Sequence, residues 1–221
     1  MPISSVRSVV LFDLDGTLVN TLPDIAAALN RLMAARGLAA FTPEEVAAMV
    51  GDGVAALVAR AFVARGVAQD GAALPDFSGD YAARVAEASR PYPAIPAVLD
   101  ELAGAGWRFA VCTNKPEAMA RRLLDALGLA RHFAAIGGGD SFPVRKPDPA
   151  HVVATLAAAG AIPAQAAMVG DHANDVKAAR AAGLPAIFAA WGYGPRDMAE
   201  GANAIAAGPE MLPGLLAALP V

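Results

Sequence analysis

Residues 9–17 read VVLFDLDGT, an apolar run followed at once by two aspartates and a glycine. We interpret Ser8–Phe12 as a buried strand. Residues two apart in an extended segment point the same way, so Asp13 and Asp15 leave the strand end together. Open α/β sheets bind ligands at this edge, and Gly16 lets the backbone approach a ligand closely. A single aspartate here would be an ordinary turn residue, but two aspartates followed by Gly-Thr indicate a functional site.

Short apolar runs alternate with helical patterns along most of the remaining chain. Continuous apolar runs are typical of strands buried on both faces of a parallel sheet. We predict further strands at Trp107–Cys112, Phe133–Ile136, Ala166–Val169, Pro185–Ala189 and Asn203–Ala206. The helices between them are predicted at Ile95–Ala105, Pro116–Leu127, Pro149–Ala159 and Asn174–Ala182. This alternation predicts an α/β fold with a doubly wound parallel sheet and a Rossmann-like core.

One long stretch after the first strand contains only helical patterns. We predict helices there at Pro23–Arg36, Pro43–Met49, Val54–Arg65 and Phe77–Ala88. Thr42 precedes Pro43 and Glu45 in the pattern of a helix N-cap with a capping box. A helical block inside an α/β domain indicates an inserted subdomain. The expected division is a core of residues 1–18 and 89–221 and an α-helical cap of residues 19–88.

Composition excludes several classes of protein. The chain has 221 residues, 56% of them hydrophobic and 17% charged, so it is not intrinsically disordered. Its formal net charge of −4 and pI near 5.3 argue against nucleic-acid binding. Cys112 is the only cysteine, so no intramolecular disulfide forms. Mean hydropathy is +0.44, yet no apolar stretch is long enough to span a bilayer, and we find no signal peptide. We therefore expect a cytoplasmic protein without a membrane partner.

A second acidic group, Asp171 and Asp175, follows the predicted strand Ala166–Val169. Aspartates four apart share one face at the start of a helix, and either one would cap that helix. Capping does not explain why four acids gather at the ends of strands predicted to be neighbours. Two carboxylates ~4 Å apart repel by about 4 kcal/mol at an effective dielectric near 20. Such a cluster needs a cation, and oxygen-only ligands favour Mg²⁺.

Two further segments offer contacts for an anion. Thr113 and Asn114 follow the strand Trp107–Cys112 and precede a helix, where a hydroxyl and free N–H groups bind phosphate. The chain has only three lysines, Lys115, Lys146 and Lys177. Lys146 and Lys115 fall inside these candidate motifs, where a compact point charge suits a phosphate. We interpret Lys177 as a solvated surface lysine.

These segments together resemble the haloacid dehalogenase superfamily of phosphohydrolases over the whole chain. Its four motifs match in order: DxDGT at Asp13–Thr17, a Ser or Thr at Thr113, a Lys at Lys146, and GDxxxD at Gly170–Asp175. The helical insertion after the first motif is similar to the cap of the first subclass. The dehalogenases and phosphonatases of this superfamily lack the second aspartate of the first motif, so Asp15 argues against both. Thr17 favours a phosphatase over a β-phosphoglucomutase.

The closest resemblance is to the phosphoglycolate phosphatase family. The segments that carry it are FDLDGTLVNTLPD, VGDGVAALVARAF, TNKPEAM, RKPDP and WGYG. Two positions depart from that pattern: His172, where a small residue is usual, and Gly194, where Asn is common after Trp-Gly-Tyr. The resemblance implies hydrolysis of 2-phosphoglycolate to glycolate and phosphate.

The resemblance also implies a role for each motif residue. Asp13 is the nucleophile that forms an aspartyl-phosphate, and Asp15 protonates the leaving group and then activates water. Mg²⁺ is held by Asp13, the Asp15 carbonyl, Asp171 and Asp175, the last directly or through water. The phosphate is bound by Lys146, Gly16, Thr113 and Asn114. The cap closes over the site and supplies specificity, for which Arg60, Lys115 and His172 are the candidates.

Three other functions stay open on the sequence. The substrate of a phosphatase could be another small or sugar phosphate. A β-phosphoglucomutase-like mutase would retain the phosphoryl group, and a silent binding domain would keep the fold without the reaction. In every case the expected partner is a small phosphorylated metabolite, and the chain is expected to be a monomer or a homodimer.

Overall fold

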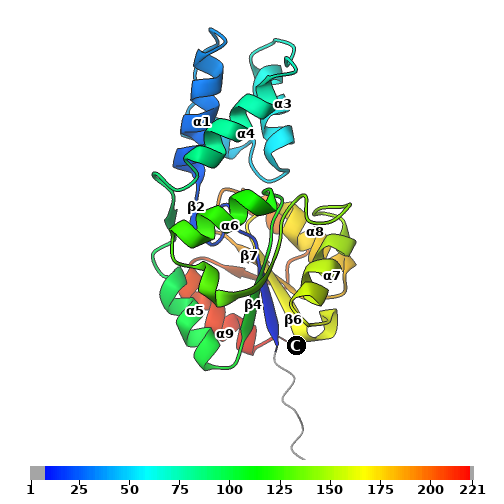
Figure 1. The fold of residues 1–221 in the computed structure, drawn as a ribbon. Coiled ribbons are helices and arrows are strands. Elements are labelled where there is room, and N and C mark those ends of the chain that lie inside the picture. The colour runs from blue at the N-terminus through cyan, green and yellow to red at the C-terminus, as the bar shows by residue number, and fades with distance from the viewer. Residues whose placement is uncertain (1–7, 220–221) are drawn as a thin grey trace, which may run out of the picture.

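The computed structural model describes residues 8–219 and has a parallel six-stranded sheet at its centre (Figure 1). The strand order is β5-β4-β1-β6-β7-β8. The bounds are β1 Val9–Phe12, β4 Arg108–Cys112, β5 Phe133–Gly137, β6 Ala166–Gly170, β7 Ala186–Ala189 and β8 Ala204–Ala206. Since the chain winds outward from β1 in both directions, the sheet is doubly wound, as expected from the alternation of strands and helices.

Helices cover both faces of the sheet, because alternate residues of each buried strand point to opposite faces. Val10 and Phe12 pack in a core with α5 (Ile95–Gly104), α6 (Glu117–Ala126) and α9 (Leu212–Ala217). Val9 and Leu11 pack with α7 (Pro149–Ala158) and α8 (Ala173–Ala181) on the other face. The sheet is therefore apolar on both sides, and polar side chains gather at its ends.

The register of the central strands sets the position of the site. Phe12 pairs with Val111 of β4 and with Val169 of β6, so the carboxyl ends of these strands meet at one edge. The N–H of Asp13 donates to Val169 O at 2.9 Å, which continues the ladder one residue past β1. The motif residues that follow each strand are thereby placed next to one another.

Four helices form the insertion, and Figure 1 shows α1, α3 and α4 standing together beyond this edge of the sheet. Their bounds are α1 Leu22–Ala34, α2 Pro43–Ala47, α3 Val54–Ala64 and α4 Ala73–Ala83. The capping box of Thr42 and Glu45 is confirmed at the start of α2. Two short antiparallel strands, β2 (Val19–Asn20) and β3 (Arg90–Pro91), join where the chain leaves the core and returns.

The six predicted strands are confirmed, each bound within one residue. The prediction for α4 is wrong in its bounds: the helix begins at Ala73, because Pro75 lies in its first turn, where no N–H donor is needed. The short elements β2, β3 and α9 were not predicted. The domain bounds stay a prediction, and their parts at residues 1–7 and 220–221 lie outside the described residues. Within residues 8–219, no helix is long and apolar enough to cross a membrane.

Candidate active site

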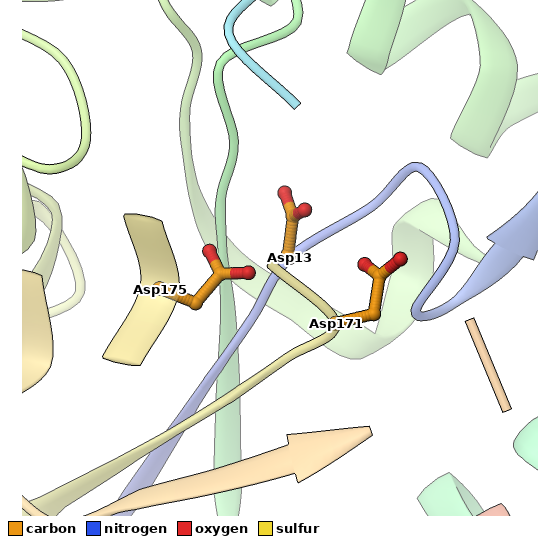
Figure 2. A group of neighbouring side chains, drawn as sticks. All are labelled: Asp13, Asp171 and Asp175. Atoms are coloured by element: carbon orange, nitrogen blue, oxygen red, sulfur yellow. The ribbon is translucent and has the colours of Figure 1, made fainter. Parts of the chain in front are cut away.

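Three buried carboxylates gather at the carboxyl edge of the sheet (Figure 2). Asp13 follows β1, Asp171 follows β6, and Asp175 lies in the first turn of α8. Each offers a carboxylate oxygen, and these oxygens lie within 4.8 Å of one another. Asp13 Oδ1 is buried, and its polar contact among the described residues is the ion pair with Lys146. The arrangement is a set of oxygen ligands around one point.

Lys146 is the cation that reaches this cluster. Its Nζ lies 2.9 Å from Asp13 Oδ1 and 2.6 Å from Asp175 Oδ1. It also donates to the carbonyl of Cys112 at 2.5 Å. Burial alone lowers the pKa of Lys146, but the two carboxylates outweigh it and hold the pKa well above its usual range. Lys146 therefore stays charged.

One ammonium does not balance three buried carboxylates. Burial raises the pKa of Asp171 to about 8, and the nearby charges of Asp13 and Asp175 add to this effect. A carboxyl that is buried among like charges binds a proton unless another cation is present. The electrostatics of the cluster thus favour a further positive charge at this point.

The carboxylate of Asp171 is held on both sides. Thr17 Oγ1 donates to Asp171 Oδ1 at 2.8 Å, and the N–H of Tyr193 donates to Oδ2 at 2.7 Å. A Cβ on Gly194 would lie 1.9 Å from the carbonyl oxygen of Asp171, so this position has no room for a side chain. Asp171 is consequently fixed in orientation before any ligand binds.

The loops that carry the predicted phosphate contacts also lie at this edge. Thr113 is buried, and its Oγ1 accepts the N–H of Lys115 at 3.2 Å. Asn114 Nδ2 donates to the carbonyls of Gly51 and Lys146, both at 2.9 Å. The N–H of Gly16 donates to Val19 O at 2.9 Å. The amide of Asn114 and the N–H of Gly16 are therefore already engaged by the protein.

Gly16 has a second role that its geometry makes plain. Its φ is +86°, and a Cβ there would lie 2.3 Å from Asp171 Oδ2. Glycine is required at this position for both its left-handed conformation and its closeness to the acidic cluster.

Asp15 contacts a different cation from the one beside Asp13 and Asp175. Lys115 Nζ donates to Asp15 Oδ1 at 2.9 Å and to the hydroxyl of Tyr81 at 2.6 Å. Lys115 and Tyr81 are 4% and 1% exposed, which excludes a solvated lysine. Because Tyr81 lies on α4, this contact joins the insertion to the core.

A loop of the insertion covers the cluster. The carbonyl of Gly51 accepts from Asn114, and Asp52 Oδ1 accepts from Asn174 Nδ2 at 2.6 Å. His172 caps α8 by accepting the N–H of Asn174 on Nδ1, and a Cβ on Gly51 would lie 2.6 Å from its ring. Burial lowers the pKa of His172. His172 thus meets the insertion loop.

Arg60 does not reach the cluster. Its guanidinium contacts Asp52 and the carbonyl of Met49, and its side chain is 44% exposed. It lines neither of the two cavities at the site. Arg60 therefore lies outside the site. The other ten predicted site residues lie at the edge of the sheet or on the loops that cover it.

Two small cavities flank Asp13 and Asp15. The larger, about 40 Å³, lies between core and insertion; its polar lining residues are Asp13, Asp15, Tyr81, Thr113, Asn114 and Lys115. The smaller, about 30 Å³, lies beside His172 and Tyr193. One water needs roughly 10–15 Å³ by such a measure, so the larger cavity accepts a ligand of only a few atoms beyond the reacting group.

The structure brings to the site three residues that were not predicted as site residues: Thr17, Tyr81 and Tyr193. Thr17 lies inside a motif that was recognised, but its bond to Asp171 spans 154 positions. Tyr193 lies in the WGYG segment, but that segment does not show which residues its side chain contacts, and Tyr81 has no local signal beyond its aromatic ring. Their partners are set by the tertiary fold.

Comparison with known proteins agrees with this geometry. Residues 10–189 match the family described as haloacid dehalogenase-like hydrolase. A phosphoglycolate phosphatase of Agrobacterium fabrum is 44% identical over 194 residues, covering 86% of this chain and 83% of the relative. One of Rhodospirillum rubrum is 44% identical over 199 residues, covering 86% and 83%.

A solved structure agrees in fold over nearly the whole chain. It is a predicted phosphoglycolate phosphatase from Haemophilus somnus 129PT, with a TM-score of 0.88 and 29% identity, covering 95% of this chain and 98% of that one. The match spans both the sheet and the helical insertion. The family matches most of this chain, and the three carboxylates lie at the predicted edge of the sheet. The chain therefore belongs to the haloacid dehalogenase-like hydrolase family.

Proposed function

We propose that this chain hydrolyses 2-phosphoglycolate to glycolate and phosphate with the help of Mg²⁺. The observation that carries the proposal is the buried cluster of Asp13, Asp171 and Asp175 beside Lys146. It occurs in a chain that is 44% identical to phosphoglycolate phosphatases over most of both lengths. The reaction class rests on the cluster, and the choice of substrate rests on the relatives and on the small cavity.

The residues of the cluster fit a hard divalent cation. All three offer carboxylate oxygens, and within residues 8–219 no nitrogen or sulfur ligand joins the cluster. Mg²⁺ prefers such ligands and keeps several waters. Asp13, Asp171 and Asp175 are the side chains that would hold it, with the carbonyl of Asp15. When bound, the cation neutralises charge on the phosphoryl oxygens.

The first chemical step belongs to Asp13 and Asp15. A carboxylate oxygen of Asp13 attacks phosphorus, so that a new P–O bond forms while the bond to the bridging oxygen of the substrate breaks. The carboxyl of Asp15 gives its proton to that oxygen, and glycolate leaves. In the second step Asp15 takes a proton from water, which attacks the aspartyl-phosphate and releases phosphate. Splitting a very slow hydrolysis into two steps is the advantage of covalent catalysis.

Lys146 and the loop after β4 bind the phosphoryl group. The ammonium of Lys146 lies against Asp13, where charge develops on the equatorial oxygens. Thr113 offers its hydroxyl. Asn114 offers its backbone N–H, since both hydrogens of its amide are bound to Gly51 and Lys146. Gly16 serves by leaving space beside Asp171.

The insertion closes the site against water and limits the size of the substrate. Its loop is bound to the core through Asn114 and Asn174, and the cavity between loop and core is about 40 Å³. Closure of a cap excludes water and completes a catalytic site. A two-carbon ester suits this space better than a hexose phosphate does.

The test is phosphate release from a panel of monoesters by the purified protein, with Mg²⁺ and with EDTA. We expect kcat/KM for 2-phosphoglycolate to exceed that for glycerol phosphate or hexose phosphates by at least about tenfold, or ~1.4 kcal/mol. Activity is expected to vanish in EDTA. A tenfold preference for a sugar phosphate would overturn the substrate, a need for a bisphosphate activator would indicate a mutase, and full activity in EDTA would overturn the metal.

A further inference from the structure

A buried cation and a phenol with unused hydrogens face the larger cavity. Lys115 and Tyr81 both line it, beside Asp15 and Phe77. The two side chains come from opposite sides, Lys115 from the loop after β4 and Tyr81 from α4 of the insertion. They lie 34 positions apart in the chain and meet only through the tertiary fold.

The hydrogen-bond count leaves two donors free. Lys115 has three ammonium hydrogens, and its partners within residues 8–219 are Asp15 Oδ1 and the Tyr81 oxygen. In the bond between them Tyr81 is the acceptor, so its own hydrogen has no acceptor among the described residues. Burial raises the pKa of Tyr81 well above its usual value, so the phenol keeps that hydrogen. Buried donors normally have partners.

The chemistry of the unused donors indicates their ligand. An ammonium hydrogen and a phenol hydrogen, 2.6 Å apart at their heavy atoms, suit the two oxygens of one carboxylate. Apart from the aspartates and the loop after β4, which serve the phosphoryl group, the cavity is lined by apolar side chains such as Ile25, Val54, Leu57 and Phe77, which offer a carboxylate no partner.

The position of the pair relative to Asp15 suits a short substrate. The group that protonates the bridging oxygen must lie within hydrogen-bond reach of that oxygen. Lys115 Nζ lies 2.9 Å from Asp15 Oδ1, and the carboxylate of 2-phosphoglycolate is one methylene away from its bridging oxygen. The separation of Asp15 and Lys115 in the protein thus matches the separation of the bridging oxygen and the carboxylate in the substrate.

We propose that Lys115 and Tyr81 form the subsite for the carboxylate of the substrate and are the residues that determine specificity. The inference rests on the proposed function. Lys115 and Tyr81 take the role in specificity for which the sequence also suggested Arg60. The guanidinium of Arg60 is bound to Asp52 and to the carbonyl of Met49, away from the cavity. Because Tyr81 belongs to the insertion, a substrate with a carboxylate binds both parts of the protein and favours the closed state, whereas a simple alkyl ester does not.

The test compares 2-phosphoglycolate with ethyl phosphate, which has the same carbon chain without the carboxylate oxygens. For the wild-type protein we expect kcat/KM to favour 2-phosphoglycolate by at least about tenfold. In Lys115→Met that preference is expected to fall to about threefold or less, because the substitution lowers kcat/KM for 2-phosphoglycolate more than for ethyl phosphate. Lys177→Met, at an exposed position on α8, is the matched control and should keep the wild-type preference.

Tyr81→Phe gives a second, milder test, since it removes only the hydroxyl. Its preference should fall by about threefold or more, with KM for 2-phosphoglycolate rising and KM for ethyl phosphate changing less. Phosphate inhibition measured on each variant checks that the phosphoryl site is intact, which keeps the result readable if Lys115→Met is poorly folded.

The outcomes separate this inference from the proposed function. If the wild-type protein has no preference for 2-phosphoglycolate over ethyl phosphate, the proposed substrate is wrong. If the wild-type preference is present and both variants retain it, or if Arg60→Met abolishes it instead, the carboxylate subsite at Lys115 and Tyr81 is wrong while the phosphatase stands.

Discussion

Lys146 and Asp175 form an ion pair of 2.6 Å with both side chains 2% exposed. Removing one partner of such a pair leaves a buried charge without compensation, which is far more costly than losing a surface pair. Lys146 lies in the loop before α7 and Asp175 in the first turn of α8, 29 positions away, and the pair lies directly beside Asp13. Lys146 thus has a structural role in the metal-free protein as well as its proposed role toward phosphate.

The first prediction concerns this pair. In EDTA, Lys146→Met should lower the free energy of unfolding by about 3 kcal/mol, because three buried carboxylates lose their ammonium. The exposed Lys177→Met should change it by less than about 0.5 kcal/mol. Urea denaturation followed by circular dichroism measures both. Equal effects of the two substitutions would show that the cluster gains nothing from Lys146.

The second prediction concerns Mg²⁺ binding. At a Mg²⁺ concentration about 100 times its dissociation constant, the wild-type protein should gain about 2.7 kcal/mol of stability. Asp171→Asn should fold but lose this gain, because the amide is a weaker ligand and removes one negative charge. Thermal unfolding and calorimetric titration with MgCl₂ measure the effect without any substrate. A wild-type gain in Asp171→Asn would place the metal elsewhere.

The third prediction concerns Tyr193, which links Asp171 to the first helix of the insertion. Its N–H binds Asp171, and its hydroxyl accepts the N–H groups of Thr21 and Leu22 at 2.7 and 2.9 Å. Tyr193→Phe keeps the first bond and loses the others, so two backbone N–H groups at the start of α1 lose their acceptor. We expect about a tenfold fall in kcat/KM for 2-phosphoglycolate with Mg²⁺ affinity unchanged. Unchanged kinetics would mean that α1 is positioned without this contact.

The fourth prediction concerns acid stability. His151 is fully buried, and burial together with the charge of Lys146 lowers its pKa to about 4. The unfolded chain has the ordinary value near 6.5, so it binds a proton between these values while the folded protein does not. Stability from this group is complete above pH 6.5 and is lost as the pH falls toward 4. His151→Gln should therefore show a flatter loss of stability across this interval than the wild-type protein. A parallel loss in both would assign the acid sensitivity to the carboxylates.

The sequence predicts the sheet well because the strands are short apolar runs bounded by polar or glycine residues. It also predicts the aspartates, since they follow strands whose ends meet the same edge, and Lys146, since it is one of three lysines and lies in a recognised motif. The contacts between insertion and core could not be predicted. Those of Asn114 with Gly51, Lys115 with Tyr81 and Tyr193 with Thr21 join residues 34 to 172 positions apart. Periodicity describes one element at a time and carries no information about which faces meet.

Arg60 and Lys115 illustrate the same limit. Both are basic residues near glycines or a motif, and the sequence alone does not tell which one faces the cavity. The fold decides, because Arg60 lies on the outer face of α3 and Lys115 follows a central strand. Burial of a charged side chain is the observation that separates a binding residue from a surface one.

The central claim, that Asp13 attacks phosphorus, is tested most directly by the stereochemical course of the reaction at phosphorus. The protein hydrolyses, with Mg²⁺, an analogue of 2-phosphoglycolate in which sulfur and one ¹⁷O make the phosphorus chiral, in water labelled with ¹⁸O, and ³¹P NMR gives the configuration of the released thiophosphate. Each in-line displacement inverts the configuration at phosphorus. Asp13 attacks first and water second in our account, so two displacements should retain the configuration. Inversion would mean that water attacks the substrate directly in one step and would contradict the account.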